Sequence, residues 1–262
     1  MWEREIYIAR KATNESGRIL RELFGKVSGI SKKGEIDLVT EADFKSEHKI
    51  LEIIGQEFPE DSILAEESGK SGVQSERRWI IDPLDGTTNF AHMFPFFAVS
   101  IALEAKGEIV IGMVYNPYFN EFFEAVKGKG AYLNGQTIKV SNTGKLQESL
   151  LATGFPYNIQ EEPDRVINLL KSMVTQAQGV RRAGSAAIDL CYVAAGRLDG
   201  FWEQDLKPWD TAAGSLIVKE AGGVLGDYIG DVYSPFKKTI VAANPYIFQA
   251  IVEITMKHSA IL

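Results

Sequence analysis

Residues 79–89 read WIIDPLDGTTN, a hydrophobic segment of the strand type that ends in two aspartates. Asp82 and Asp85 converge at the predicted strand end, where two carboxylates repel each other unless a cation lies between them. Gly86 and Thr87 come next, and a turn of this kind presents backbone N–H groups that can meet an anion. This one segment therefore predicts both a metal site and a phosphate site at the end of a strand.

The composition narrows the class of protein. A length of 262 residues, 45% of them hydrophobic, suits one large folded domain or two packed halves. The formal net charge of −7 argues against a nucleic-acid-binding module, which usually carries a basic face. The sequence has neither an apolar run of membrane-spanning length nor a signal-peptide pattern at its start. We therefore expect a cytoplasmic protein with no membrane segment and no nucleic-acid partner.

Cysteine and histidine give little support for thiol or zinc chemistry. The single cysteine, Cys191, lies in the apolar segment LCYVAA, a setting typical of a buried structural thiol. One cysteine cannot form an intrachain disulfide and suits a reducing compartment. The three histidines are scattered and show no zinc-ligand spacing.

The hydrophobic pattern predicts helices and strands along the whole chain. Apolar residues recur at helical spacing between about 2 and 27, and Thr40 has the form of a helix N-cap. Short strand-like segments follow, and the second half alternates helices and strands more regularly. We expect a single domain over residues 1–262, an α/β (α+β) layered sandwich in two packed halves of about 1–140 and 141–262.

Further acidic residues accompany other predicted elements. Glu66 and Glu67 directly follow a short strand-like segment, and Asp210 stands at a helix start. Asp37 and Asp43 lie around a predicted transition from loop to helix. Each of these residues, taken singly, is explained as a helix cap or a solvated side chain. They indicate a site only as a set.

As a set, these segments resemble the inositol monophosphatase family of magnesium-dependent, lithium-sensitive phosphatases. The resemblance covers nearly the whole chain and is carried, in the family's order, by DLVTEAD at 37–43, AEES at 65–68, WIIDPLDGTTNF at 79–90, PWDTAAG at 208–214 and EAGG at 220–223. The paired-aspartate segment is highly specific for the family. The resemblance implies a layered αβαβα sandwich and a homodimer.

The resemblance also implies a site for two Mg²⁺ ions and a third, weaker one near Glu66. Glu66, Asp82 and the backbone carbonyl of Leu84 are the expected ligands of the first ion. Asp82, Asp85 and Asp210 are the expected ligands of the second, so that Asp82 bridges the pair. Oxygen donors without histidine suit Mg²⁺, which keeps several of its waters.

The implied reaction is hydrolysis of a phosphate monoester by a metal-activated water, with no covalent phosphoenzyme. Glu66 is expected to accept the proton of the water with the help of Thr87, which contacts Asp43. The backbone N–H groups of Gly86 and Thr87 are expected to hold phosphate oxygens. Asp37 is expected to support this loop rather than to bind metal.

The implied substrate is a small phosphorylated polyol or sugar, with myo-inositol 1-phosphate or 4-phosphate first. Glu203 stands where the family contacts ring hydroxyls, and Gly184 and Ala186 are expected to lie against the ring. A surface or subunit contact is the first explanation of Arg181 and Arg182, because Arg pairs readily with nearby acids. Alternatively, one of them, with Arg182 named as a substrate residue, could bind a second phosphate.

Two alternatives remain open. The first is the same chemistry on fructose 1,6-bisphosphate or on a broad range of small phosphates; a nucleotide substrate is less expected because no base-binding insertion is evident. The second is a regulatory partner protein that keeps the phosphatase fold. A scaffold without activity would have no physical reason to hold four mutually repelling carboxylates at one site.

Overall fold

The computed structural model describes residues 2–26, 30–32, 38–161 and 163–259. The helices are α1 (Glu3–Leu23), α2 (Glu41–Glu57), α3 (Thr87–Ala91), α4 (Pro163–Val174), α5 (Ala186–Ala194), α6 (Pro208–Glu220) and α7 (Phe248–Lys257). The strands are β1 (Ile30–Lys32), β2 (Leu38–Thr40), β3 (Ser62–Ala65), β4 (Gly69–Gly72), β5 (Arg77–Asp85), β6 (Ala98–Ala105), β7 (Glu108–Asn116), β8 (Glu121–Val126), β9 (Ala131–Leu133), β10 (Gln136–Thr137), β11 (Leu150–Thr153), β12 (Gly179–Arg181), β13 (Gly200–Gln204), β14 (Val224–Gly226) and β15 (Thr239–Ala243), with a 3-10 turn at Leu146–Glu148.

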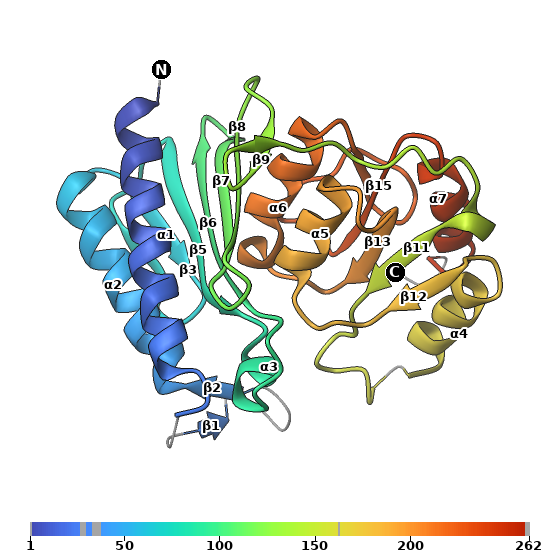
Figure 1. Ribbon diagram of the computed structural model, residues 1–262, viewed down its shortest axis with the longest axis horizontal. Helices are drawn as coiled ribbons and strands as arrows, with labels where there is room; N and C mark the ends of the chain where they lie inside the picture. Colours follow the sequence, from blue (N-terminus) through green and yellow to red (C-terminus); the bar gives the residue numbers. More distant parts are fainter. Residues whose placement is uncertain (1, 27–29, 33–37, 162, 260–262) are drawn as a thin grey trace.

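The elements form five layers (Figure 1). The first sheet has the order β10-β9-β8-β7-β6-β5-β3-β4, and the second has the order β12-β11-β13-β15-β14. Helices α1 and α2 cover the outer face of the first sheet, α5 and α6 lie between the sheets, and α4 and α7 cover the second sheet. The predicted αβαβα sandwich is therefore confirmed, while the division into halves near residue 140 stays a prediction.

The apolar segment Trp79–Ile81 within β5 is continuous because both faces of this central strand are buried. Trp79 and Ile81 pack toward α1 and α2, whereas Ile80 packs into the core of the middle layer. This alternation is the two-residue period of a strand. Cys191 is buried in the same middle-layer core, as its apolar neighbours predict.

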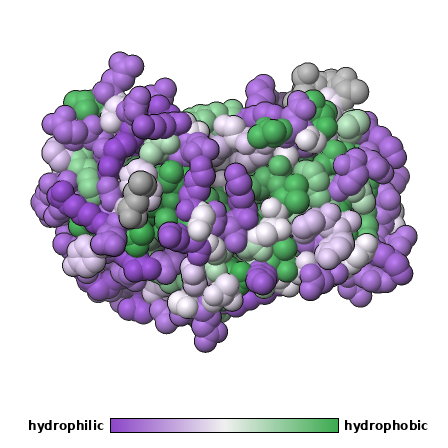
Figure 2. Space-filling view, turned by 90° about the horizontal axis from the view of Figure 1, so that it is seen from above, coloured by the Kyte–Doolittle hydropathy of each residue, from purple (hydrophilic) through white to green (hydrophobic). Residues whose placement is uncertain are grey.

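The outer surface is mainly polar. Seen from above, hydrophilic residues cover most of the visible face, and hydrophobic ones gather in smaller groups toward its middle (Figure 2). Among the helices of the described residues, none is long and apolar enough to cross a membrane.

The sheet topology brings several chain segments to one place. Strands β3 and β5 are parallel neighbours in which Ala65 pairs with Ile81, so the residues that follow both strands emerge at the same edge. The pairing of β5 with β6 shifts register between Asp82 and Asp85, which bends the end of the strand. A site that spans the first sheet and the middle layer is the result.

Candidate active site

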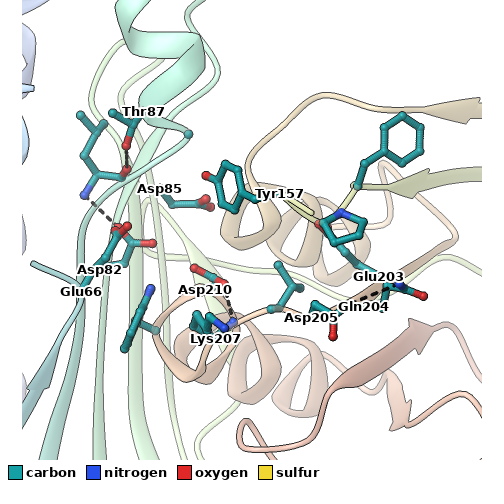
Figure 3. A pocket seen from close by; sticks show the side chains of 16 residues that line it. Glu66, Asp82, Asp85, Thr87, Tyr157, Glu203, Gln204, Asp205, Lys207 and Asp210 are labelled. Atoms are coloured by element: carbon teal, nitrogen blue, oxygen red, sulfur yellow. Dashed lines mark hydrogen bonds between the residues drawn. The ribbon is translucent and has the colours of Figure 1, made fainter. Parts of the chain in front are cut away.

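The four carboxylates predicted to bind metal come from three segments and line one cavity of about 210 Å³, which Glu203 and Asp205 line as well. Glu66 follows β3, and its N–H donates to the carbonyl of Ile81 at 3.1 Å. Asp82 and Asp85 close β5, and Asp210 lies in the first turn of α6. Figure 3 shows these four side chains approaching one another across the cavity. Leu84, Gly86 and Thr87 line it as well, so the structure brings together all the predicted metal ligands.

Backbone and hydroxyl donors hold three of these carboxylates in place. Asp82 Oδ1 accepts the N–H of Leu84 at 2.9 Å. Asp85 Oδ2 accepts the hydroxyl of Ser185 at 2.6 Å and the N–H of Ala187 at 2.7 Å. Asp210 Oδ2 accepts the N–H of Lys207 at 2.6 Å, closing a capping box at the start of α6. Each of these contacts uses one oxygen, which leaves the other to face a ligand.

The ionised form of the three aspartates is unfavourable when no cation is bound beside them. Burial, followed by repulsion from Glu66 and two neighbouring aspartates, raises the pKa of Asp82 well above its usual value. Burial raises the pKa of Asp85 to about 6, although its hydrogen bonds from Ser185 and Ala187 act in the opposite direction. Burial, then repulsion from Asp85, also raises the pKa of Asp210. A bound cation would offset both effects.

The chemistry of these donors fits Mg²⁺. Across the residues that the structure describes, no three His, Cys, Asp or Glu side chains already form a cage around a single ion position. A tetrahedral structural metal needs such a cage, but Mg²⁺ is usually held by one or two carboxylates together with waters and substrate oxygens. Carboxylate and carbonyl oxygens without histidine or cysteine are therefore a donor set that suits Mg²⁺.

Thr87 connects the cavity to helix α2. Its hydroxyl hydrogen lies within reach of two acceptors, Asp43 Oδ1 at 2.9 Å and the carbonyl of Leu84 at 3.1 Å. Asp43 is fully buried, and its Oδ2 accepts the N–H and the hydroxyl of Thr40 at 2.7 and 2.6 Å. Burial raises the pKa of Asp43, and the hydrogen bonds from Thr40 and Thr87 oppose this rise. Asp43 therefore reaches the cavity through Thr87.

Gly86 occupies a position that only glycine fits. Its φ is +91°, and a Cβ atom would lie 2.9 Å from the carbonyl oxygen of Phe96 and 3.2 Å from that of Gly184. Left-handed backbone is costly for residues with a side chain, and these two backbone oxygens cannot move aside easily. The turn therefore presents bare backbone next to the carboxylates.

A second cavity of about 100 Å³ shares Asp85, Thr87 and Asp210 with the first. It is lined by all the predicted substrate residues: Gly86, Thr87, Arg182, Gly184, Ala186 and Glu203. Glu203, on β13, packs against Gly154, where a Cβ atom would lie only 2.0 Å from Glu203 Oε1. The guanidinium of Arg182 lies 5.4 Å from the ring of Phe155 at the exposed rim, while Arg181 is exposed and outside this lining.

Asp189, on α5, is a lining residue that the sequence analysis missed. It is buried, and burial, then repulsion from Asp85, raises the pKa of its carboxyl, while Arg182 lowers it. Burial and repulsion from Asp189 likewise raise the pKa of Glu203. The available signal was one acid inside the apolar run from Ala186 to Ala195. Asp37, the predicted loop support, lies outside the described residues.

Comparisons with known proteins show the family and the fold of the chain. A model of the inositol monophosphatase family matches residues 1–260. The inositol-1-monophosphatase of Synechocystis sp. is 48% identical over 244 residues, covering 92% of this chain and 85% of the relative. The Nus factor SuhB of Escherichia coli K12 is 42% identical over 246 residues, covering 93% and 92%. The solved structure of the suppressor protein SuhB from Bartonella henselae superposes with a TM-score of 0.92 at 41% identity, covering 97% of this chain and 99% of that one.

Proposed function

Because the chain belongs to the inositol monophosphatase family, we propose that it hydrolyses a phosphate monoester of a small cyclic polyol with the help of Mg²⁺. The first proposed substrate is myo-inositol 1-phosphate or 4-phosphate, which would yield myo-inositol and inorganic phosphate. The observation that carries the proposal is that the four carboxylates predicted to bind metal line one cavity, which continues into a second cavity lined in part by glycines.

The first ion would be held by Glu66, Asp82 and the carbonyl of Leu84, and the second by Asp82, Asp85 and Asp210. A third, weaker ion near Glu66 is part of the proposal. When bound, Mg²⁺ would supply an activated water and would stabilise the negative charge of the phosphoryl group and of the leaving oxygen.

The protein's own groups would position the phosphate and move one proton. The backbone N–H groups of Gly86 and Thr87 would donate to phosphate oxygens at the start of α3. Because Asp43 accepts the Thr87 hydroxyl hydrogen, the lone pairs of that hydroxyl would remain free to orient the attacking water. Glu66, on the same cavity wall, would accept the proton of that water.

The charges of the second cavity favour a neutral ring over a second phosphate. Glu203 and Asp189 are both buried there, while the single arginine of the lining, Arg182, is exposed at the rim. Ring hydroxyls can both donate and accept hydrogen bonds, so they can pair with these acids in either protonation state. A second phosphate would bring more negative charge to a cavity whose buried acids already have a raised pKa. An inositol phosphate therefore ranks above fructose 1,6-bisphosphate.

A homodimer, a cytoplasmic location and inhibition by Li⁺ are proposed on the same family grounds. Tyr118 and Phe119, in the turn between β7 and β8, are 52% and 50% exposed and their ring centroids lie 5.3 Å apart. Exposed aromatic residues are enriched in protein interfaces, so this turn is a candidate for the subunit contact. Light scattering after size exclusion would measure the oligomeric state.

A second candidate role is that of a regulatory partner protein. It rests on the 42% identity to the E. coli protein named Nus factor SuhB. The complete carboxylate set favours an active phosphatase, and a protein can combine both roles.

The test is phosphate release by the purified protein with Mg²⁺, comparing inositol 1-phosphate with fructose 1,6-bisphosphate, each with and without Li⁺. We expect a clear preference for inositol 1-phosphate, loss of activity in Asp82→Asn, and selective loss of inositol phosphate turnover in Glu203→Gln. Undiminished turnover of inositol phosphate by Glu203→Gln, or better turnover of the bisphosphate by the wild type, would refute the substrate assignment. No release from any phosphate monoester would refute the activity.

A further inference from the structure

Helix α2 carries a buried glutamate that holds the loop next to Glu66. Glu47 Oε2 accepts the N–H of Glu67 at 2.9 Å, and Glu47 Oε1 accepts the N–H of Ser68 at 2.9 Å. Glu47 is buried, and two backbone donors to its carboxyl oxygens compensate for the burial of this polar group. Glu47 lines neither cavity of the site.

These contacts fix the backbone of Glu66 from two sides. On one side the Glu66 N–H is bound to Ile81 of β5, and on the other the next two residues are bound to Glu47 of α2. Anchoring the backbone on both sides fixes the Cα–Cβ bond from which the Glu66 side chain extends. The direction of the Glu66 carboxylate therefore depends on α2.

Ser46, one residue earlier, makes a parallel contact with the second ligand-bearing loop. Its hydroxyl donates to the carbonyl of Pro83 at 2.7 Å and lies 2.5 Å from the hydroxyl of Ser16 on α1. Pro83 directly precedes Leu84, whose carbonyl is a proposed metal ligand. Ser46 and Glu47 lie three and four residues after Asp43, so the three side chains share one face of the helix.

We propose that Glu47 is a positioning residue for Glu66, and that Ser46 has the same role for the segment Pro83–Leu84. Helix α2 then sets the affinity of the site for Mg²⁺ without touching the ion. This inference rests on the proposed function, because it concerns the same metal site. Replacing a residue that hydrogen-bonds to a metal ligand, without itself touching the ion, typically weakens metal affinity 10- to 100-fold.

The experiment compares Glu47→Gln with Glu52→Gln, a control on the same helix whose side chain is exposed and pairs with Lys49. Mg²⁺ binding is measured without substrate, from the rise in melting temperature with Mg²⁺ concentration and by calorimetry. The Mg²⁺ concentration for half-maximal phosphate release is measured separately. Circular dichroism and the melting temperature in EDTA report the metal-free fold.

For Glu47→Gln we expect Mg²⁺ binding to weaken about 10- to 100-fold, with most of kcat recovered at saturating Mg²⁺. Glu52→Gln should stay within about twofold of the wild type, as an exposed ion pair contributes little. A purely structural role would lower the melting temperature in EDTA and leave the Mg²⁺ constant unchanged. A folded Glu47→Gln whose Mg²⁺ constant is within twofold of the wild type overturns the proposal.

Ser46→Ala keeps the test decisive if Glu47→Gln does not fold. It removes the neutral hydrogen bonds of the Ser46 hydroxyl to Pro83 and Ser16, and loss of the bond to Pro83 should weaken Mg²⁺ binding about fivefold. An unchanged constant in this variant also counts against the proposal. If the wild type itself binds no Mg²⁺, the proposed function fails; if the wild type binds and the variants bind equally well, only the role of α2 fails.

Discussion

Replacing Asp85 by asparagine should stabilise the metal-free protein while removing a proposed Mg²⁺ ligand. Burial raises the pKa of Asp85 from 3.8 to about 6, which corresponds to about 3 kcal/mol of destabilisation at pH 7.5. This is an upper limit because Asp85 is partly open to the cavity. The amide oxygen that Asp85→Asn introduces can still accept from Ser185 and Ala187, so the hydrogen bonds need not be lost.

The sign of the pH dependence follows from the raised pKa. An acid whose pKa is raised on folding destabilises the folded state above its folded pKa, here about 6. The destabilisation disappears as the pH falls through 6 toward 3.8, because the protonated acid carries no charge. The advantage of Asp85→Asn over the wild type should therefore be largest at pH 7.5 and nearly absent at pH 4.

Urea unfolding in EDTA, followed by tryptophan fluorescence at several pH values, measures this advantage. Asp227→Asn is a control for which the change in stability should have the opposite sign. Burial alone would raise the pKa of Asp227, but its hydrogen bonds and its ion pair with Lys237 at 2.6 Å outweigh burial and lower the pKa. Removing this charge should therefore destabilise the protein. Added Mg²⁺ should stabilise the wild type much more than Asp85→Asn. An Asp85→Asn protein that is no more stable than the wild type at pH 7.5 would refute the reasoning.

Three shorter predictions concern activity. Thr87→Val should fold normally and lose about 10²- to 10⁴-fold in kcat, the usual range for a lost proton-transfer contribution. Thr87→Ser should keep most of the wild-type kcat. Equal single-turnover rates for Thr87→Val and the wild type would contradict this prediction. Asp189→Asn should raise the kcat/KM of fructose 1,6-bisphosphate relative to inositol 1-phosphate, and an unchanged ratio would count against the charge argument. Gly86→Ala should lose most phosphate release, because a Cβ atom would lie 2.9 Å from the carbonyl oxygen of Phe96; wild-type activity in this variant would show that the turn is not constrained.

The motif residues could be predicted because their positions at element ends are visible in the sequence. Asp82 and Asp85 follow an apolar strand segment, and the turn after them needs a glycine at position 86. Their meeting with Asp210 depends on topology, namely on where the start of α6 lies relative to the end of β5, and only the family resemblance indicated it.

Asp189 and Glu47 could not be found in the same way. Both are acids inside helices, and helical periodicity does not tell which side of a helix faces a neighbouring loop. Asp189 faces the second cavity because α5 lies between the two sheets. Glu47 contacts the loop after β3 because α2 packs against the neighbouring strand β5. Their roles come from tertiary packing, which a single sequence does not contain.

The arrangement of Asp85 joins the metal cavity to the substrate cavity. Its Oδ2 accepts hydrogen bonds from Ser185 and Ala187 at the start of α5. Ser185 also lines the second cavity, together with Gly184 and Ala186. A substrate ring bound in the second cavity would therefore contact the N-terminal end of α5, which holds Asp85, a proposed metal ligand. Since the carboxylate of Asp85 and its donors form one hydrogen-bonded unit, we expect occupancy of the two cavities to be coupled through Asp85.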